Sequence, residues 1–267
     1  MNIVTWNVNS LKARTEFVSL FIDKEAPDII CMQELKLQTE AVDTDFFLER
    51  GYSHLAIHGQ KQWNGVLIAS KVPFKSALYG LPKGEAGQSR FVAVEFDDFC
   101  LVNLYCPQGQ SEDSDKYVYK LSFYDALIEW LSERIAQGGS VMVTGDLNIA
   151  PESCDVFWDT EAEPNIVSHH PLELEKWAEL IGLGLTDIGR SFIPEGGFTF
   201  WDYRGFWDFN AKRFRYDRGM RIDHFLVTEN LIPHVSQVEV YRGWRRNRGK
   251  LKASDHAPVL LSLTPSK

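Results

Sequence analysis

The chain has 267 residues, of which 44% are hydrophobic and 24% charged, as in an ordinary soluble globular protein, so a fibrous or wholly disordered chain is excluded. A chain of this length can bury a full core as one α/β domain over residues 1–267. Its formal net charge of −9 argues at first against a nucleic-acid partner, because phosphate binding favours clustered Lys and Arg.

Short apolar segments recur along the chain and predict β-strands at residues 3–5, 28–32, 65–69, 91–96, 100–105, 141–144, 222–227, 237–240 and 259–263. Amphipathic segments separate them, most clearly residues 117–135, which end before Gly138 and Gly139. The apolar side chains of this segment recur at helical spacing: Leu121, Tyr124, Leu127, Ile128, Leu131 and Ile135. Because strands and helices are mixed, without a repeat or a long linker, the pattern predicts one α/β domain with a mixed sheet.

Polar residues stand where several of these strands end. Asp146 and Asn148 lie two positions apart after a run of β-branched residues, so strand alternation turns both side chains to one face. Open α/β sheets place their chemistry at such carboxyl ends. Similar polar groups follow three other strands and precede the last one: Asn7 with Asn9, Glu34, Tyr105 with Gln108, and Asp255 with His256.

This ordered set, with Arg221-Ile222-Asp223 between the fourth and fifth groups, resembles the exonuclease III family of magnesium-dependent DNA repair nucleases. The resemblance covers essentially the whole chain. It implies a four-layered α/β sandwich, in which two packed mixed β-sheets are flanked by helices and the active site lies along one edge. It also implies Mg²⁺ as cofactor, with Mn²⁺ able to substitute, and double-stranded DNA with abasic sites or 3′ ends as partner.

The resemblance makes Glu34 the principal metal ligand, with Asn7 beside it and Asp255 close by. A carboxylate is the kind of hard oxygen ligand that Mg²⁺ takes once or twice per site. Taken singly, Glu34 would be interpreted as a helix-start carboxylate or a surface charge, and Asn7 as a turn amide. The surrounding motifs favour the metal site.

The resemblance also assigns the catalytic groups. Asp146 orients or deprotonates the attacking water, and Asn148 hydrogen-bonds this water or the phosphate oxygens. Asp223 holds the ring of His256 and favours its imidazolium, which can donate to the scissile phosphate. Tyr105 can donate its phenol to the same phosphate, although an aromatic side chain at a strand end is also a common packing residue.

Substrate-binding residues are predicted by matching family positions. Aromatic and aliphatic side chains would form the wall of a deoxyribose pocket, and polar ones would lie near the DNA backbone. Met220 replaces a Trp of some relatives, which gives a more adaptable wall. The predicted substrate and DNA residues are Asn9, Arg90, Gln108, Lys120, Phe200, Trp201, Arg218, Met220 and Ile222.

His169 and His170 depart from the family pattern, because relatives usually carry a small or apolar pair before the corresponding helix. An imidazole that projects toward the sugar pocket would obstruct a flipped-out internal abasic nucleotide and still admit a frayed 3′ end. The alternative is that both histidines lie on the surface and the full set of family activities is intact. The sequence leaves both hypotheses open.

Charge is spread unevenly along the chain. Residues 204–252 hold 12 Lys plus Arg against 5 Asp plus Glu, a net of +7, which leaves −16 on the rest. This segment predicts a basic face for DNA, although a solvated charge run would give the same count.

Two other functions are compatible with the pattern, namely a phosphatase or phosphodiesterase of the superfamily acting on a lipid or small phosphorylated molecule, and a non-catalytic DNA-binding protein. The motifs around Tyr105 and Asp223 favour the DNA nuclease, and no catalytic group is lost. No leader and no apolar run of membrane-spanning length precede or interrupt these motifs, and the four cysteines lie far apart, as suits a reducing cytosol. We therefore expect a cytoplasmic protein without a membrane partner, and the family implies a monomer.

Overall fold

The computed structural model describes residues 1–157, 166–203 and 214–264, and contains two six-stranded mixed β-sheets. The first sheet has the order β11-β12-β1-β2-β4-β3, with β1 Asn2–Asn7, β2 Ile29–Gln33, β3 His54–His58, β4 Val66–Ser70, β11 Val235–Val240 and β12 Val259–Leu263. The second has the order β5-β6-β7-β8-β10-β9, with β5 Ser76–Tyr79, β6 Phe91–Glu95, β7 Cys100–Tyr105, β8 Val141–Asp146, β9 Leu185–Asp187 and β10 Asp223–Thr228. Every predicted strand is confirmed within about two residues, whereas the short β3, β5 and β9 were not predicted.

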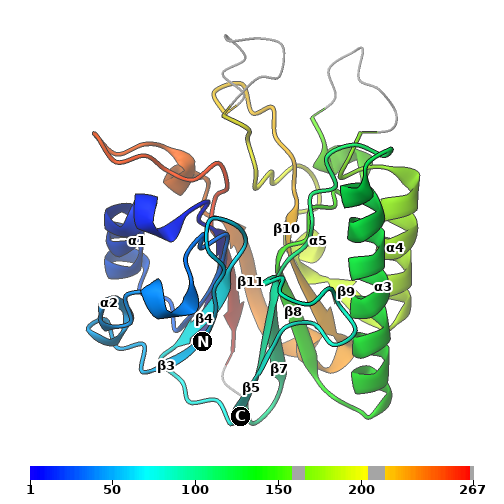
Figure 1. The fold of residues 1–267 in the computed structure, drawn as a ribbon, viewed down its shortest axis with the longest axis horizontal. Helices are drawn as coiled ribbons and strands as arrows, with labels where there is room; N and C mark the ends of the chain where they lie inside the picture. The colour runs from blue at the N-terminus through cyan, green and yellow to red at the C-terminus, as the bar shows by residue number, and fades with distance from the viewer. Residues whose placement is uncertain (158–165, 204–213, 265–267) are drawn as a thin grey trace.

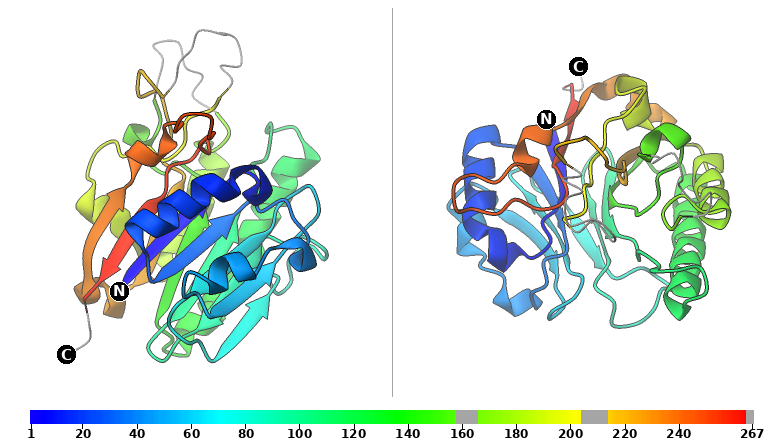
Figure 2. Two further views of the ribbon diagram at one scale, coloured as in Figure 1. Left: turned by 90° about the vertical axis from the view of Figure 1, so that its left-hand side faces the viewer. Right: turned by 90° about the horizontal axis from the view of Figure 1, so that it is seen from above.

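Helices cover the outer face of each sheet (Figures 1 and 2). Helices α1 (Leu11–Glu25) and α2 (Asp45–Leu48) flank the first sheet, and α3 (Asp115–Ala136) and α4 (Pro171–Gly182) flank the second. Shorter elements are α5 (Ile188–Phe192) and the 3₁₀ turns η1 (Thr39–Ala41), η2 (Ser153–Asp155), η3 (Glu229–His234) and η4 (Arg242–Arg245). Helix α3 confirms the helix predicted at residues 117–135.

Three apolar clusters separate these layers. The central one fills the space between the sheets and includes Ile3 and Ile29 from the first and Val92 and Phe225 from the second. One outer cluster packs α1 on the first sheet, and the other packs α3 and α4 on the second. The predicted four-layered α/β sandwich is therefore confirmed. Within the described residues, no helix has both the length and the apolar character needed to cross a membrane.

A buried polar contact joins the two sheets. The Gln33 side chain donates to Asn103 Oδ1 at 2.7 Å, and Asn103 donates in turn to the carbonyls of Met32 and Leu67 at 2.9 and 2.8 Å. Since a buried amide costs free energy when it is unpaired, these bonds favour one register between the sheets.

Strand pairing brings the polar strand ends to one edge. β1 and β2 are parallel, as are β7 and β8, so Asn7 lies beside the end of β2 and Tyr105 pairs in register with Asp146. β10 runs antiparallel to β8 and begins at Asp223, which pairs with Asp146. Gly145 allows this approach, because its φ is +132° and a Cβ there would lie 2.0 Å from the Leu104 carbonyl oxygen.

Candidate active site

Three side chains from different strands meet at this edge. The Asn7 amide donates to Glu34 Oε1 at 2.8 Å and to Asp146 Oδ2 at 2.9 Å, so it bridges the two carboxylates. Asn7 and Asp146 are buried, and Glu34 follows β2 with a φ of +54°. The strand ends predicted to form the site are therefore brought into contact across the two sheets.

Glu34 also forms an ion pair with Lys36, a residue that was not predicted from the sequence. Lys36 Nζ lies 2.9 Å from Glu34 Oε2 and 2.6 Å from Asn9 Oδ1. Asn9 in turn donates to both carboxylate oxygens of Asp255, at 3.0 and 3.2 Å. The signal for Lys36 was its position two residues after Glu34, although only the folded loop places the two charges together.

His256 lies in a buried carboxylate pocket. Its Nδ1 is 2.8 Å from Asp223 Oδ2, and its Nε2 is 3.7 Å from Asp146 Oδ2. Burial opposes the imidazolium, but Asp223 and Asp146 outweigh it and raise the pKa of His256 to about 10. The ring is thus a cation at neutral pH. Its Nδ1 is hydrogen-bonded to Asp223, whereas its Nε2 is too far from Asp146 for a direct hydrogen bond.

Asp146 lies near Nε2 of that ring, and Asn148 is bound to Asp146. Burial raises the pKa of Asp146 to about 7, with His256 opposing the rise and Asp223 adding to it. Asp146 Oδ1 accepts from the Asn148 backbone N–H at 3.0 Å, and the Asn148 amide donates to the Cys106 carbonyl at 3.0 Å. A carboxylate with a pKa near neutrality suits a general base.

Two groups of side chains at this edge offer ligand atoms for a cation. Asp146, Asp223 and His256 lie within 4.8 Å of one another and could hold a metal ion. A protonated His256 has no lone pair for a metal, however. Glu34 offers a hard carboxylate oxygen and has the Asn7 side chain beside it, which fits Mg²⁺, although Lys36 at 2.9 Å would have to move aside or share this carboxylate with the ion.

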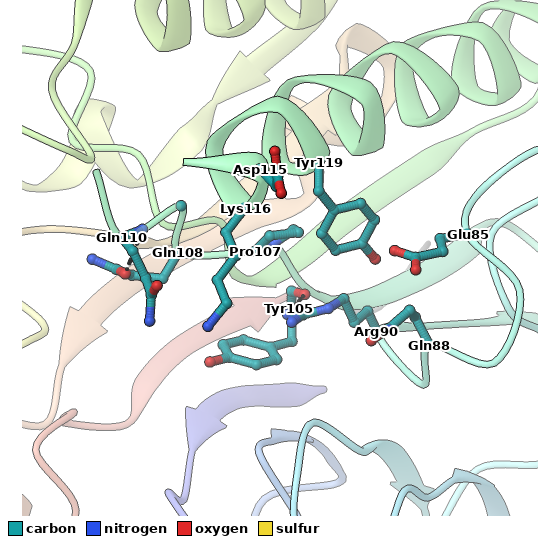
Figure 3. Close-up of a pocket in the computed structure, with 11 residues that line it drawn as sticks. Glu85, Gln88, Arg90, Tyr105, Pro107, Gln108, Gln110, Asp115, Lys116 and Tyr119 are labelled. Atoms are coloured by element: carbon teal, nitrogen blue, oxygen red, sulfur yellow. Dashed lines mark hydrogen bonds between the residues drawn. The ribbon is translucent and has the colours of Figure 1, made fainter. Parts of the chain in front are cut away.

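Tyr105 borders a cavity of about 380 Å³ next to the site (Figure 3). Burial, with the Glu34 and Asp146 carboxylates, raises the pKa of Tyr105 well above its usual value, so the phenol keeps its proton. The Arg90 guanidinium lies 4.8 Å from the Tyr105 ring centroid and donates to its carbonyl at 3.2 Å. Gln108 and Lys116 also line this cavity, together with Glu85 and Asp115, so its surface is polar and carries charges of both signs.

The predicted sugar-pocket wall is only partly formed as expected. Phe200, Met220 and Ile222 do pack in one small cluster, and the Phe200 ring centroid is 4.8 Å from that of His256. Trp201 is also buried, and its indole N–H donates to Asp217 Oδ1 at 3.2 Å, so its place in the wall stays a prediction. Arg218 lies next to this segment, with its guanidinium 5.2 Å from the Phe157 ring centroid.

Lys120 is placed differently from its predicted DNA contact. It is fully buried on α3, 2.5 Å from Glu173 Oε1, and donates to the carbonyls of Asn148 at 2.8 Å and Gln108 at 3.3 Å. Burial lowers the pKa of Lys120 although Glu173 opposes this. Lys120 therefore holds the backbone carbonyls of Asn148 and Gln108 from inside the protein and does not reach the surface.

The two histidines have different surroundings. His169 Nδ1 lies 2.6 Å from the carbonyl oxygen of Ala150, which belongs to the cluster of Phe200 and Met220. His170 is the N-cap of α4, with Nδ1 accepting from the Leu172 N–H at 3.3 Å and Nε2 at 3.0 Å from Glu112. His169 is thus the histidine adjacent to the candidate sugar pocket.

Only some of the cations in the predicted basic segment, residues 204–252, lie on the surface. Residues 204–213 lie outside the described residues. Arg221 is buried and paired with Asp155 and Asp187 at 2.7 Å each, and Arg245 is 8% exposed. Both were counted toward the basic face, and for both this interpretation is wrong.

Known proteins share this architecture over its full length. Residues 4–256 match the model of the endonuclease/exonuclease/phosphatase family. The chain is 31% identical to an exodeoxyribonuclease III of Haemophilus influenzae over 272 residues, covering 97% of this chain and 98% of the relative. A Neisseria 3′ phosphatase bound to a product DNA hairpin has a TM-score of 0.90 at 32% identity, with 99% of both chains covered.

An abasic-site endonuclease from Archaeoglobus fulgidus is similar to the same degree, with a TM-score of 0.90 at 30% identity, and the match covers 98% of this chain and 99% of that one. These relatives differ in the activity they are named for, but each is at least 30% identical to this chain over almost its whole length. The chain therefore belongs to the exonuclease III and abasic-site endonuclease family, and is a metal-dependent phosphodiesterase of the DNA repair nuclease type.

Proposed function

We propose that this protein hydrolyses phosphodiesters at 3′ ends of duplex DNA, with the residues around His256 as its catalytic groups. The observation that carries this proposal is the buried imidazolium, held by Asp223 at 2.8 Å and placed beside Asp146 and the Asn7–Glu34 pair. A fixed cation in a buried site is suited to the charge that develops on a phosphate during hydrolysis.

In this proposal Asp146 takes the proton of the attacking water, and the Oδ1 of Asn148 orients that water because its amide nitrogen is bound to Cys106. His256 donates from Nε2 to a phosphate oxygen while Asp223 fixes its other nitrogen. A divalent cation bound at Glu34, with Asn7 and Asp255 nearby, would neutralise phosphate charge; Mg²⁺ is the expected ion and Mn²⁺ a substitute.

Contacts with DNA are proposed at two places. Arg90 and Gln108, which line the cavity beside Tyr105, would bind the backbone on the α3 side, and Asn9 would position the metal end of the site. Phe200, Met220 and Ile222 would contact the terminal sugar, with Arg218 at their edge. The DNA hairpin bound by the similar Neisseria 3′ phosphatase supports duplex DNA as the partner.

We further propose that His169 limits entry of internal abasic nucleotides. Its ring is tied to Ala150, within the cluster that would contact the sugar, whereas His170 is used to cap α4 and bind Glu112. An internal nucleotide must first be extruded from the duplex, and the lost stacking and pairing cost a few kcal/mol. A frayed 3′ end can approach this pocket without that step. Trimming or unblocking of 3′ ends is then favoured over abasic-site incision.

The test compares a duplex with an internal abasic site and one with a 3′-blocked nick, each with Mg²⁺ and with EDTA. We expect the parent to clear the nicked duplex, His169→Gly to gain abasic incision, and His170→Gly, the control, to gain none. If the parent incises both duplexes equally, the gate proposal is wrong. If it cleaves neither with Mg²⁺, the proposed function fails.

The cellular setting is also proposed, as cytoplasmic and monomeric. All four cysteines are free, and Cys31, Cys100 and Cys106 are buried, which is compatible with a reducing compartment. Gel filtration with light scattering would test the monomer.

A further inference from the structure

Residues 246–252 form a compact hairpin, here called the basic hairpin. Its ends are closed by two backbone hydrogen bonds between Arg248 and Leu251, each 3.0 Å, and Gly249 makes the turn with a φ of +60°. The Asn247 side chain accepts from the Ala253 N–H at 2.9 Å, and the Arg248 guanidinium lies 4.0 Å from the Trp244 ring centroid. The segment is therefore a fixed structure that presents its side chains in one arrangement.

In the part of the chain that the structure describes, the cations of the basic hairpin have no carboxylate partner. Arg246, Arg248, Lys250 and Lys252 are exposed, and none makes an ion pair within residues 1–157, 166–203 and 214–264. By contrast, Arg242, which precedes the hairpin, is paired with Asp217 at 3.1 Å. Four neighbouring cations without counter-charges repel one another, so the arrangement favours an external anion.

A groove of about 340 Å³ separates the basic hairpin from the first turns of α1. Lys12 and Arg14 line its α1 side, Lys250 and Lys252 line its hairpin side, and Glu16 is its one acidic residue. Figure 1 shows this part of the chain, in orange, as a loop above α1. The groove thus holds cations on both walls.

The groove is connected to the candidate active site through two tethers. Arg14 donates to the Asn9 carbonyl and, at 3.0 Å, to the Tyr203 hydroxyl. Tyr203 donates to the carbonyl of Ala253, the residue after the hairpin, and Asn9 holds Asp255. The groove and the candidate active site are therefore linked by side chains that hold both in place.

We propose that the basic hairpin and the first turns of α1 bind the phosphate backbone of the duplex away from the reacting phosphate, and so supply part of the affinity for DNA. This inference rests on the proposed function. Duplex DNA carries closely spaced phosphates along its length, so more than one of them can face the cations on the two walls of the groove. Since the chain as a whole has a net charge of −9, such affinity must come from a local surface.

The test is the salt dependence of DNA binding by the full chain. The hairpin variant combines Lys250→Gln with Lys252→Gln and so removes two cations that line the groove. The control variant combines Lys24→Gln with Lys71→Gln and so removes two cations near the C-terminal ends of α1 and β4, outside the groove. All proteins carry Asp146→Ala to prevent cleavage. Fluorescence anisotropy of a labelled duplex with a recessed 3′ end gives Kd at several NaCl concentrations.

Each lost phosphate contact lowers the slope of log Kd against log salt by roughly 0.9. We expect the hairpin variant to lose roughly 1 to 2 from this slope and the control variant to keep the parent slope. In proteins that retain Asp146, the hairpin variant should raise KM for the same duplex and leave kcat unchanged. If the hairpin variant has the parent melting temperature and its salt slope is unchanged, the inference is overturned. The unpaired cations would then have to serve another anion, such as an acidic protein. Absence of duplex binding by the parent would instead count against the proposed function.

Discussion

At the scale of single residues, the site depends on how buried charges set each other's protonation. Asp223 and Asp146 together raise the pKa of His256 to about 10, and burial raises that of Asp146 to about 7. The two groups are therefore a base that is ionised above neutral pH and an acid that keeps its proton until strongly alkaline pH.

This arrangement predicts a bell-shaped pH dependence of kcat/KM on 3′-blocked DNA. Below about 7 Asp146 is protonated and cannot accept a proton from water, and above about 10 His256 is neutral and cannot stabilise the phosphate, so the rate falls on both sides. Asp223→Asn removes a carboxylate that raises the pKa of His256, so the alkaline limb should move to lower pH while the acid limb changes less. An alkaline limb that stays in place in Asp223→Asn would contradict the assigned role of Asp223.

Residues that the sequence analysis misplaced have a common cause. Lys120 and Arg221 both match positions near a site in the pattern, yet the fold buries them and pairs their charges with buried carboxylates inside the protein. The sequence does not distinguish a lysine or arginine on the surface from one in a buried ion pair. The neighbouring residues in the fold decide which of the two environments it has.

At the scale of elements, α3 and α4 are joined by a buried ion pair that also supports the site. Lys120 and Glu173 are both 0% exposed, and Glu173 Oε2 accepts from the backbone N–H of His170 at 3.0 Å. Lys120 binds the carbonyl of Asn148, whose φ of +51° is a left-handed conformation that needs such support. The pair thus couples the start of α4 to the loop after β8.

Lys120→Met is expected to reduce the free energy of unfolding by about 3–5 kcal/mol, because it leaves Glu173 buried without a cation. The double variant Lys120→Met with Glu173→Leu should recover much of this loss, since it removes both charges. Urea denaturation measures both values. Equal losses in the single and double variants would show that the pair has no such role.

At the scale of the whole molecule, the chain folds back so that its two ends lie in one sheet. β1 pairs with β12 from Asn2 to Thr5, and the Gln33–Asn103 contact joins the two sheets in the interior. Separation of either sheet would expose the central apolar cluster between them.

We therefore expect residues 1–267 to unfold as one domain, with a single calorimetric transition whose measured enthalpy equals the van't Hoff enthalpy. Asn103→Ala should lower the transition temperature without splitting the transition, because it removes three buried side-chain hydrogen bonds and leaves the strand pairing intact. Two resolved transitions would contradict the single-domain prediction.

The sequence by itself determined the elements and the chemical groups. Apolar periodicity predicted the longer strands and α3, and the order of the polar strand ends predicted the family, because these signals are local and each needs only a few neighbouring residues. It could not predict β3, β5 and β9, which are short strands with weak patterns of their own. The tertiary structure decided which strand ends meet, that Lys36 faces Glu34, that His169 rather than His170 contacts Ala150 in the cluster of Phe200 and Met220, and that the basic hairpin faces α1. These facts depend on contacts between residues far apart in the chain, and such contacts are fixed by packing and by the pairing of buried polar groups.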